Sequence, residues 1–262
     1  MTFTRVTKLN PCPVCKKPDW CRVFADGWAE CMRVQSDTPA KSGGWMHSLC
    51  LVPPVARPAE TPRQQPPTIN ATRMMRDWLA ATAPAALDDL ATSLGLSTPS
   101  VTAVGAAWAP PHGAWAFPMC DGHGNVVGIR LRNGHGKFAV RGSRQGIFLA
   151  TVPAQKTLFV CEGPTDTAAA IELGLFAAGR PNCCCGGPEI NVFARRHGVC
   201  RVVVISDNDK PGLDGARMVG GELRLPFAIY VPPAKDVREF VRLGGTRVII
   251  DNTLKGTVWQ NG

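Results

Sequence analysis

The sequence contains no long apolar run, and this absence argues against a membrane-spanning helix. No part of the 262-residue chain approaches the roughly 18 consecutive apolar residues that cross a bilayer. Its first eleven residues are polar and lack the apolar core of a secretory signal peptide. We therefore expect a cytoplasmic protein with no membrane partner.

Two other absences narrow the possible chemistry. The chain holds a single tyrosine, Tyr230, in an apolar run typical of a sheet strand, which is a poor position for a nucleophile. No Gly-x4-Gly-Lys-Ser/Thr loop occurs, so the chain has no helicase module of the phosphate-loop type. The sequence thus argues against a covalent tyrosine intermediate and against a nucleotide-driven motor.

The cysteines do not suit a disulfide framework. There are 11, an odd number in a chain without a signal peptide, which disfavours a disulfide scaffold. Four are spaced Cys12-x2-Cys15-x5-Cys21-x9-Cys31, and this spacing indicates a metal site. We expect the remaining thiols to be small buried residues; they are Cys50, Cys120, Cys161, Cys183, Cys184, Cys185 and Cys200.

A predicted hairpin brings the last two of these four cysteines to the first two. Residues 24–28 are typical of a three-residue hairpin loop with Gly27 in the left-handed conformation. This turn places Cys21 opposite Cys31, at a cross-strand distance of about 5 Å. Four thiolates suit a structural Zn²⁺, and His47 is the alternative to Cys21 as the fourth ligand. The cysteine-rich segment 1–50, called the head below, needs metal to fold because its apolar core is small.

The rest of the chain divides by composition and by hydrophobic period. A proline-rich stretch at 51–70 is predicted to be an extended linker. Helical spacing follows from residue 74, period-two alternation begins at residue 115, and strands alternate with helices from residue 156. That last pattern predicts a parallel sheet with crossover helices. The expected segments are a zinc-binding ribbon (1–50), the linker (51–70), a mixed α+β basic subdomain (71–154), an α/β domain with a mainly parallel sheet (155–247) and a tail (248–262).

Acidic residues follow two of the predicted strands. Glu162 comes directly after the strand at 158–161, and Asp207 and Asp209 follow the strand at 202–206. The carboxyl ends of parallel strands form the ligand-binding edge of a sheet, so we expect these carboxylates to lie together. Alternation would place Asp207 and Asp209 on the same side. Carboxylate oxygens are the ligands that Mg²⁺ and Mn²⁺ prefer.

The roles of Asp166 and Gly163, which lie close to Glu162 in the sequence, are less clearly defined by the pattern. Asp166 either joins this site or merely caps the helix predicted at 165–173, and the sequence favours neither. Gly163 would allow the backbone next to Glu162 to approach a ligand closely.

A one-sided basic stretch precedes the acidic residues. Between Asp121 and Glu162 there is no acidic residue. The basic residues there are Arg130, Arg132, Lys137, Arg141, Arg144 and Lys156. Arg130 and Arg132 alternate with apolar residues and so share one face of a strand, where they can follow a phosphate backbone or simply face solvent. With the net charge of +9, this stretch favours a polyanionic partner.

The acidic residues resemble the TOPRIM signature of bacterial-type primases, topoisomerases and some nucleases. The signature corresponds to Glu162-Gly163 and Asp207-x-Asp209. The wider runs at 161–166, 207–212 and 235–238 resemble primases of bacteriophages and other mobile elements. The likeness covers the head, with its Cys-Pro-Val-Cys, and residues 115–245. The zinc spacing departs from the better-known primase pattern, in which the last two ligands form a second close pair.

This resemblance implies a DNA primase that makes short RNA primers. Glu162, Asp207 and Asp209 would be catalytic and would hold Mg²⁺ or Mn²⁺, and the head would read the template. The residues implied in binding nucleic acid or nucleotide are Arg130, Arg132, Lys137, Arg141, Lys235 and Asp236. The implied partners are a single-stranded DNA template, ribonucleoside triphosphates and a separate replicative helicase. A TOPRIM-type nuclease and a non-catalytic DNA-binding or regulatory protein remain alternatives.

Overall fold

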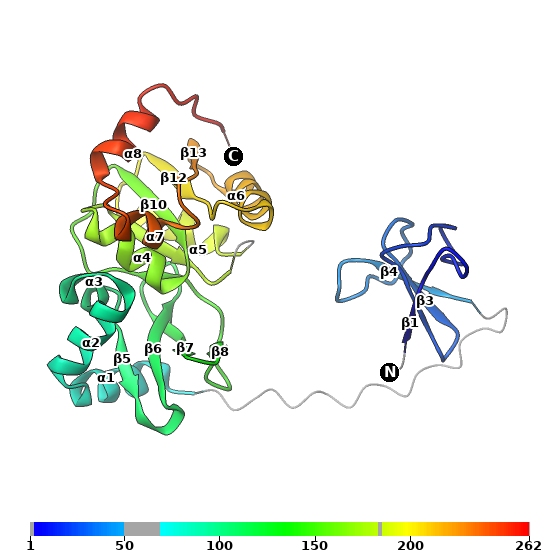
Figure 1. The fold of residues 1–262 in the computed structure, drawn as a ribbon, viewed down its shortest axis with the longest axis horizontal. Coiled ribbons are helices and arrows are strands. Elements are labelled where there is room, and N and C mark those ends of the chain that lie inside the picture. The colour runs from blue at the N-terminus through cyan, green and yellow to red at the C-terminus, as the bar shows by residue number, and fades with distance from the viewer. Residues whose placement is uncertain (1–2, 50–68, 183–184, 262) are drawn as a thin grey trace. The chain divides into compact units, whose positions relative to one another are not determined.

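A computed structural model describes residues 3–49, 69–182 and 185–261 of the protein. The chain forms two compact units, residues 1–64 and 65–262 (Figure 1). The predicted linker at 51–70 lies almost wholly outside the described residues, as do Cys50, Cys183 and Cys184. Within the described ranges, no helix is both long and apolar enough to cross a bilayer.

The first unit is an antiparallel sheet in the order β1-β2-β3-β4. Its strands are β1 (Phe3–Arg5), β2 (Arg22–Phe24), β3 (Trp28–Cys31) and β4 (Trp45–Ser48). In the β2–β3 hairpin Val23 lies opposite Ala29, and Gly27 has a φ of 79°, which glycine adopts without steric cost. The predicted hairpin is therefore present. Its buried cluster is small and consists mainly of cysteines with Val6.

Helices open the second unit. They are α1 (Ala71–Ala81), α2 (Pro84–Leu94) and α3 (Thr98–Ala103). Pro84 begins α2, where the missing N–H costs no hydrogen bond, and Gly95 ends it with a φ of 68°. Helical spacing had predicted α1 and α2, whereas the short α3 was not expected.

An antiparallel sheet follows, in the order β5-β6-β7-β8. Its strands are β5 (Ala107–Ala109), β6 (Ala114–Cys120), β7 (Val126–Asn133) and β8 (Gly136–Ala139). Met75 of α1 packs on the inner side of this sheet against Ala116, Ile129 and Leu131. Asp121 fixes the β6–β7 turn because its side chain accepts hydrogen bonds from backbone N–H groups within the turn.

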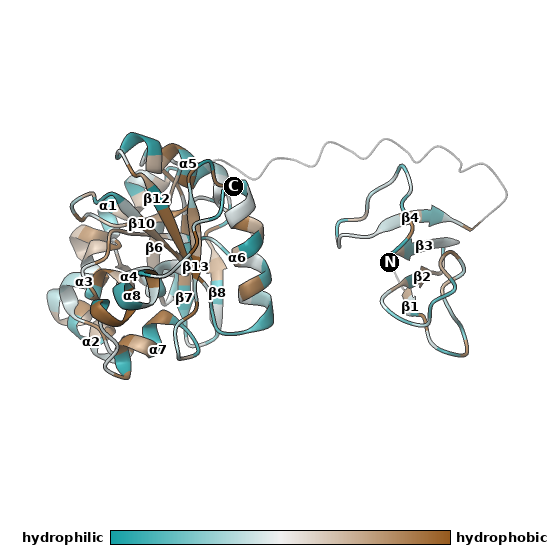
Figure 2. Ribbon diagram, turned by 90° about the horizontal axis from the view of Figure 1, so that it is seen from above, coloured by the Kyte–Doolittle hydropathy of each residue, from teal (hydrophilic) through white to brown (hydrophobic). Residues whose placement is uncertain are grey.

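The largest sheet is mainly parallel, as the sequence predicted. Its order is β13-β12-β10-β11-β9, and only β9 at one edge runs antiparallel. The strands are β9 (Phe148–Leu149), β10 (Thr157–Glu162), β11 (Ala177–Arg180), β12 (Arg201–Ile205) and β13 (Phe227–Tyr230). The central strands β10 and β12 carry apolar runs, at 158–161 and 202–205, that are buried, as is typical of strands covered on both faces. Figure 2 shows this hydrophobic character along β12.

Helices cover both faces of this sheet (Figure 1). They are α4 (Gly163–Glu172), α5 (Gly187–Arg196), α6 (Lys210–Glu222), α7 (Val237–Arg242) and α8 (Arg247–Leu254). The small side chains of α4 share a buried cluster with α2, α3, α7 and α8, while α5 and α6 pack in a second cluster. The first cluster runs across residue 154, so one continuous core joins the basic subdomain to the parallel sheet. The boundary expected there stays a prediction.

Three sequence expectations need comment. The pair β11 and α5 was not predicted, although it separates β10 from β12 in the chain. The tail is more ordered than expected: Ile250 of α8 is buried, and Gln260 pairs with Phe227 at the sheet edge. Among the other cysteines, Cys120 and Cys161 are buried as predicted. The prediction for Cys200 was wrong, because it lies in the exposed turn before β12.

Candidate functional site

The four head cysteines converge. Cys12 and Cys15 lie in the loop after β1, Cys21 directly precedes β2, and Cys31 ends β3. Their Sγ atoms all lie within 4.8 Å of one another, and those of Cys15 and Cys21 are 3.7 Å apart. Four sulfurs bound to one Zn²⁺ at about 2.3 Å form a tetrahedron with edges of about 3.8 Å. The cluster therefore fits a structural Zn²⁺.

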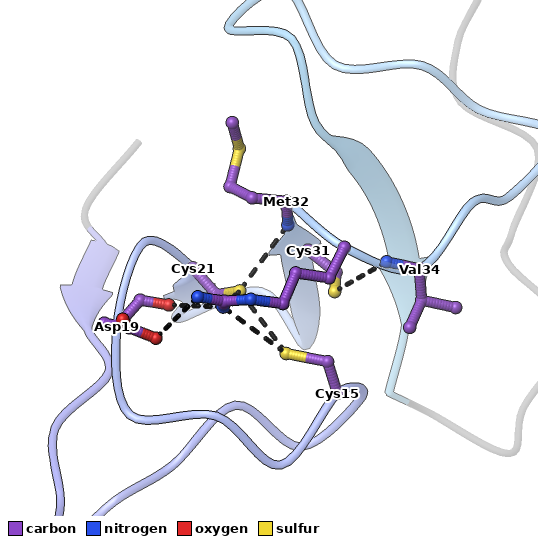
Figure 3. Close-up of polar contacts among 7 residues, drawn as sticks. Cys15, Asp19, Cys21, Cys31, Met32 and Val34 are labelled. Atoms are coloured by element: carbon purple, nitrogen blue, oxygen red, sulfur yellow. Dashed lines mark hydrogen bonds and ion pairs between the residues drawn. The ribbon is translucent and has the colours of Figure 1, made fainter.

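Hydrogen bonds to sulfur favour ionised cysteines here. Figure 3 shows the sulfurs of the labelled cysteines turned toward one another. The backbone N–H of Met32 donates to Cys21 Sγ at 3.5 Å, and that of Val34 donates to Cys31 Sγ at 3.3 Å. Arg33 Nη1 lies 4.0 Å from two of the sulfurs. Such outer donors stabilise negative charge on metal-binding sulfur.

The thiols of this cluster differ in acidity. Burial acts to raise the pKa of Cys15, but hydrogen bonds from the Lys17 backbone and the neighbouring thiols lower it to about 7. Burial raises the pKa of Cys21 to about 12. Ionisation of all four neighbouring thiols therefore requires a cation among them.

The alternative ligand His47 lies outside the cluster. It sits in β4 opposite Ala29, and its Nε2 atom is 3.0 Å from the carbonyl oxygen of Val34. The hairpin register instead carries Cys21 to Cys31. The structure thus favours Cys21 over His47.

The acidic residues gather at the point where the order of strands along the chain reverses in the parallel sheet. From β10 the chain crosses to β11 on one side, and from β12 it continues to β13 on the other. The carboxyl ends of β10 and β12 therefore flank a topological switch point, where open α/β sheets bind ligands. Glu162 is the last residue of β10, and Asp207 follows β12 by two residues. The two lie close enough for the Glu162 charge to raise the pKa of Asp207.

Two other acidic residues begin helices. Asp209 accepts a hydrogen bond from the Gly212 N–H at 2.7 Å and caps α6. Asp236 caps α7 in the same way, accepting from the Glu239 N–H at 2.7 Å. Asp209 lies beyond the end of β12, so the alternation of side chains along a strand does not set its direction. The expectation that alternation would place Asp207 and Asp209 on the same side therefore has no basis in the backbone. One oxygen of each carboxylate is engaged by its helix, which fixes the position of the other.

Asp166 is part of this site, and capping does not explain it. The cap position of α4 is Glu162, while Asp166 lies inside the first turn and is buried. Its Oδ1 atom has no hydrogen-bond partner among the described residues. Burial, followed by the charges of Asp236 and Asp207, raises the pKa of Asp166 to about 7. Its spacing from Glu162, one helical turn, was the available sequence signal.

Repulsion between these carboxylates is visible in Asp207 as well. Burial raises its pKa to about 6, with further contributions from Glu162, Asp236 and Asp209. Within the described ranges, only the four cysteines bring three or more metal-type ligand atoms within 4.8 Å, so the carboxylates are more widely spread. Hard oxygen ligands and the unpaired Asp166 oxygen fit a divalent cation such as Mg²⁺.

Gly163 has a backbone conformation that favours glycine. Its φ is 78°, and a Cβ added there would meet no atom within 4 Å. The left-handed backbone, which costs other residues about 1–2 kcal/mol, turns the chain sharply from β10 into α4. Glycine is therefore needed for the sharp turn directly after Glu162, and with open space beside it the expected close approach of a ligand stays a prediction.

Two of the predicted basic residues, Arg132 of β7 and Lys137 of β8, act electrostatically on this cluster. Arg132 lies opposite Lys137 in the sheet, and its Nη1 atom donates to Thr165 Oγ1 at 2.8 Å. The Lys137 charge acts on Asp166, lowering its pKa against the other effects. Arg130 Nη2 donates to the Pro181 carbonyl at 3.2 Å. These arginines are partly buried between the sheets, so the solvated-face alternative does not describe them.

The remaining predicted residues lie at the rim. Arg141 is exposed just beyond β8, and the Lys235 side chain is exposed beside Asp236. The Lys235 backbone holds the loop: its carbonyl accepts from the Asn208 N–H at 2.8 Å. Arg238, not predicted, lies 4.0 Å from Asp236 and acts electrostatically on Arg132.

Comparison with solved structures gives this fold a precedent. The E. coli primase catalytic core matches with a TM-score of 0.55 at 15% identity over 72% of this chain and 79% of that one. A DnaG primase catalytic domain bound to single-stranded DNA matches with a TM-score of 0.52 at 15% identity, over 69% and 77%. The primase fragment of the bacteriophage T7 primase-helicase protein matches with a TM-score of 0.50 at 16% identity, over 95% and 99%.

These likenesses establish the fold. The protein has the architecture of primase catalytic cores, which confirms the predicted fold class. No family model and no curated protein sequence matches the chain.

Proposed function

We propose that the protein is a DNA primase, a nucleotidyltransferase that makes short RNA primers on single-stranded DNA. The observation that carries this proposal is the meeting of carboxylates and basic side chains at the switch point of a primase-type fold. A polyanionic reactant would be held by the basic face, while its phosphates would face the acidic cluster through a cation.

Each side chain has a role in this proposal. Glu162, Asp207 and Asp209 would hold Mg²⁺ or Mn²⁺, with Asp166 and Asp236 adding charge around them. When bound, the cation would neutralise phosphate charge and align the 3′-hydroxyl with the α-phosphate. The protein itself supplies orientation, because strand ends and helix caps fix these carboxylates in place.

The basic residues would bind the substrates. Arg132 and Lys137 both interact electrostatically with Asp166, and they would contact triphosphate oxygens bound by the same cation. Arg130, Arg141 and Lys235 would contact the template or the nucleotide around them. A solved neighbour of this fold is a primase domain bound to single-stranded DNA, which supports such a template here.

The zinc head would select the start sequence on the template. A proline-rich stretch between the units would let it reach the catalytic unit, at a cost in effective concentration. Strand opening would fall to a separate replicative helicase.

Incubation of the protein with single-stranded DNA, Mg²⁺ and labelled ribonucleotides tests the proposal. New short RNA is the expected product. Asp207→Asn should lower synthesis by at least about two orders of magnitude, because the cation loses a ligand. Asp214→Asn is the matched control, since Asp214 lies on α6, directly after the loop that holds Asp207, but is exposed and pairs with Lys210 and Arg217. Shortened DNA would instead support a nuclease, and neither product a DNA-binding protein without turnover.

A further inference from the structure

The head exposes one large aromatic side chain in an unusual backbone conformation. Trp20 is 77% exposed, although a tryptophan in water forgoes a large gain from burial. Its φ is 69°, a region that costs a bulky residue free energy. Neither the exposure nor the backbone strain benefits the folding of the head.

The anchoring of Trp20 is rigid. The next residue, Cys21, is buried in the cysteine cluster and receives the Met32 N–H. On the other side, the Asp19 carboxylate and carbonyl both accept hydrogen bonds from Arg33. The indole is therefore presented from a fixed loop, which reduces the entropy lost when a ligand stacks on it.

A basic cleft adjoins the indole. The cleft has a volume of about 480 Å³ and is lined by Trp20 together with Arg5, Arg22 and Asp19 among others. Arg33 pairs with Asp19 at 2.7 Å, and Arg22 lies 3.6 Å from the buried Glu30. Arg5 is exposed at the cleft, and Lys16 and Lys17, exposed in the loop that leads to Trp20, add further positive charge.

We infer that Trp20 is a stacking platform for one unpaired base of single-stranded DNA, with Arg5 and Arg22 holding the adjacent phosphates. An exposed aromatic ring beside a cationic groove is the arrangement that binds single strands, because every base has a face that stacks. The inference rests on the proposed function, since it gives the template-reading role of the head a particular residue. It requires no base-specific hydrogen bond.

Binding of a labelled oligothymidylate to the full-length protein, without Mg²⁺ or ribonucleotides, tests this inference. Trp20→Gly should weaken binding roughly tenfold, and glycine at this φ does not disturb the loop. Trp20→Phe keeps an aromatic face and should bind within about threefold of the wild type. Leu9→Ala is the matched control, because Leu9 is 93% exposed on the same unit and should not affect binding. Zinc content of each variant confirms an intact head.

Tryptophan fluorescence gives a second readout that a structural role would not change. Oligothymidylate should quench the wild-type protein and should lose that part of the quenching in Trp20→Phe, although this variant still binds. Equal affinity of Trp20→Gly and wild type, or identical quenching of Trp20→Phe and wild type, would overturn the inference. These outcomes are independent of synthesis: a wild type that binds through Trp20 but makes no primers would refute the proposed primase and leave the base platform standing.

Discussion

The cysteine cluster of the head and the carboxylate cluster of the parallel sheet collect metal-type ligands in opposite ways. The four sulfurs lie within 4.8 Å of one another on largely buried residues, and those of Cys21 and Cys31 accept backbone hydrogen bonds. The carboxylates are more widely spread, and Asp166 keeps a buried oxygen without a partner among the described residues. The first arrangement is closed and the second is open toward the basic face.

The chemistry of the ligands explains this difference. Protonated thiols are neutral and pack like small apolar side chains, so the chain itself can bring them together. Carboxylates carry charge at neutral pH and repel one another, so the rest of the fold must hold them near one another against that repulsion. A closed site stabilises the unit that contains it, whereas an open and unsatisfied site is available for a substrate and its cation.

Zinc removal should have the largest effect, and it should lower the stability of the first unit without changing that of the second. Structural zinc contributes on the order of 10 kcal/mol to folding of a small unit, so chelation should unfold the head and leave the second unit folded. Hydrogen exchange on the intact protein measures both. Cys12→Ala should act like the chelator, while Cys120→Ala, which removes a buried thiol of the second unit, should not affect the head. If the head kept its protection from hydrogen exchange after chelation, the buried thiols alone would be sufficient to form its core.

Asp166→Asn should stabilise the protein while impairing primer synthesis. Burial and neighbouring carboxylates raise the pKa of Asp166 to about 7, so its ionisation destabilises the fold increasingly as pH rises from about 4 to 7. In EDTA at pH 8 the variant should gain about 2 kcal/mol in denaturant unfolding, and the gain should shrink toward pH 4. A loss of stability at pH 8 would contradict the picture of an unsatisfied carboxylate.

Gly163→Ala tests whether backbone direction holds Glu162 in the open site. Alanine at a φ of 78° should lower stability by about 1–2 kcal/mol and reduce primer synthesis by turning Glu162. Gly221→Ala is the control with the opposite sign. Gly221 is exposed in α6 with open space around it, so alanine there should stabilise by about 0.5–1 kcal/mol. Equal effects of the two substitutions would argue against a special turn at Gly163.

Glu172 supplies a satisfied carboxylate against which Asp166 can be compared. It accepts hydrogen bonds from the Ser97 backbone and from the hydroxyls of Ser97 and Ser100. Burial acts to raise its pKa, but these hydrogen bonds outweigh burial and lower the pKa of Glu172 below its usual value. Glu172→Gln should cost about 1 kcal/mol at pH 7, allowing for solvent screening.

The pH dependence should also be the reverse of that at Asp166. A carboxyl group whose pKa is lower in the folded than in the unfolded state stabilises the fold at pH values above its unfolded pKa. That stabilisation is lost as the pH falls through the folded pKa. The difference between Glu172→Gln and wild type should therefore shrink in acid. Denaturant unfolding at pH 7 and pH 3 measures it, and a difference that grew on acidification would show the hydrogen bonds to be unimportant.

Local patterns in the sequence accounted for much of the fold. The turn at Gly27 and the alternation in β6 and β7 depend on neighbouring residues, and each appears where it was predicted. The strand β11 and the helix α5 were missed because Ala177–Arg180 is small and carries a charge, without the apolar run of a typical buried strand. The burial of β11 comes from β10 and β9 on either side.

The sequence alone determined the ligand types: cysteines at metal spacing in the head, and carboxylates just after two apolar strands. Spacing along the chain sets these features, because a hairpin or a strand end is a local property. Only the tertiary structure decided which of these groups meet. It brought Asp166 and Asp236 to Asp207, faced them with Arg132 and Lys137, and left His47 outside the cysteine cluster, because strand order and helix packing join residues that the chain keeps far apart.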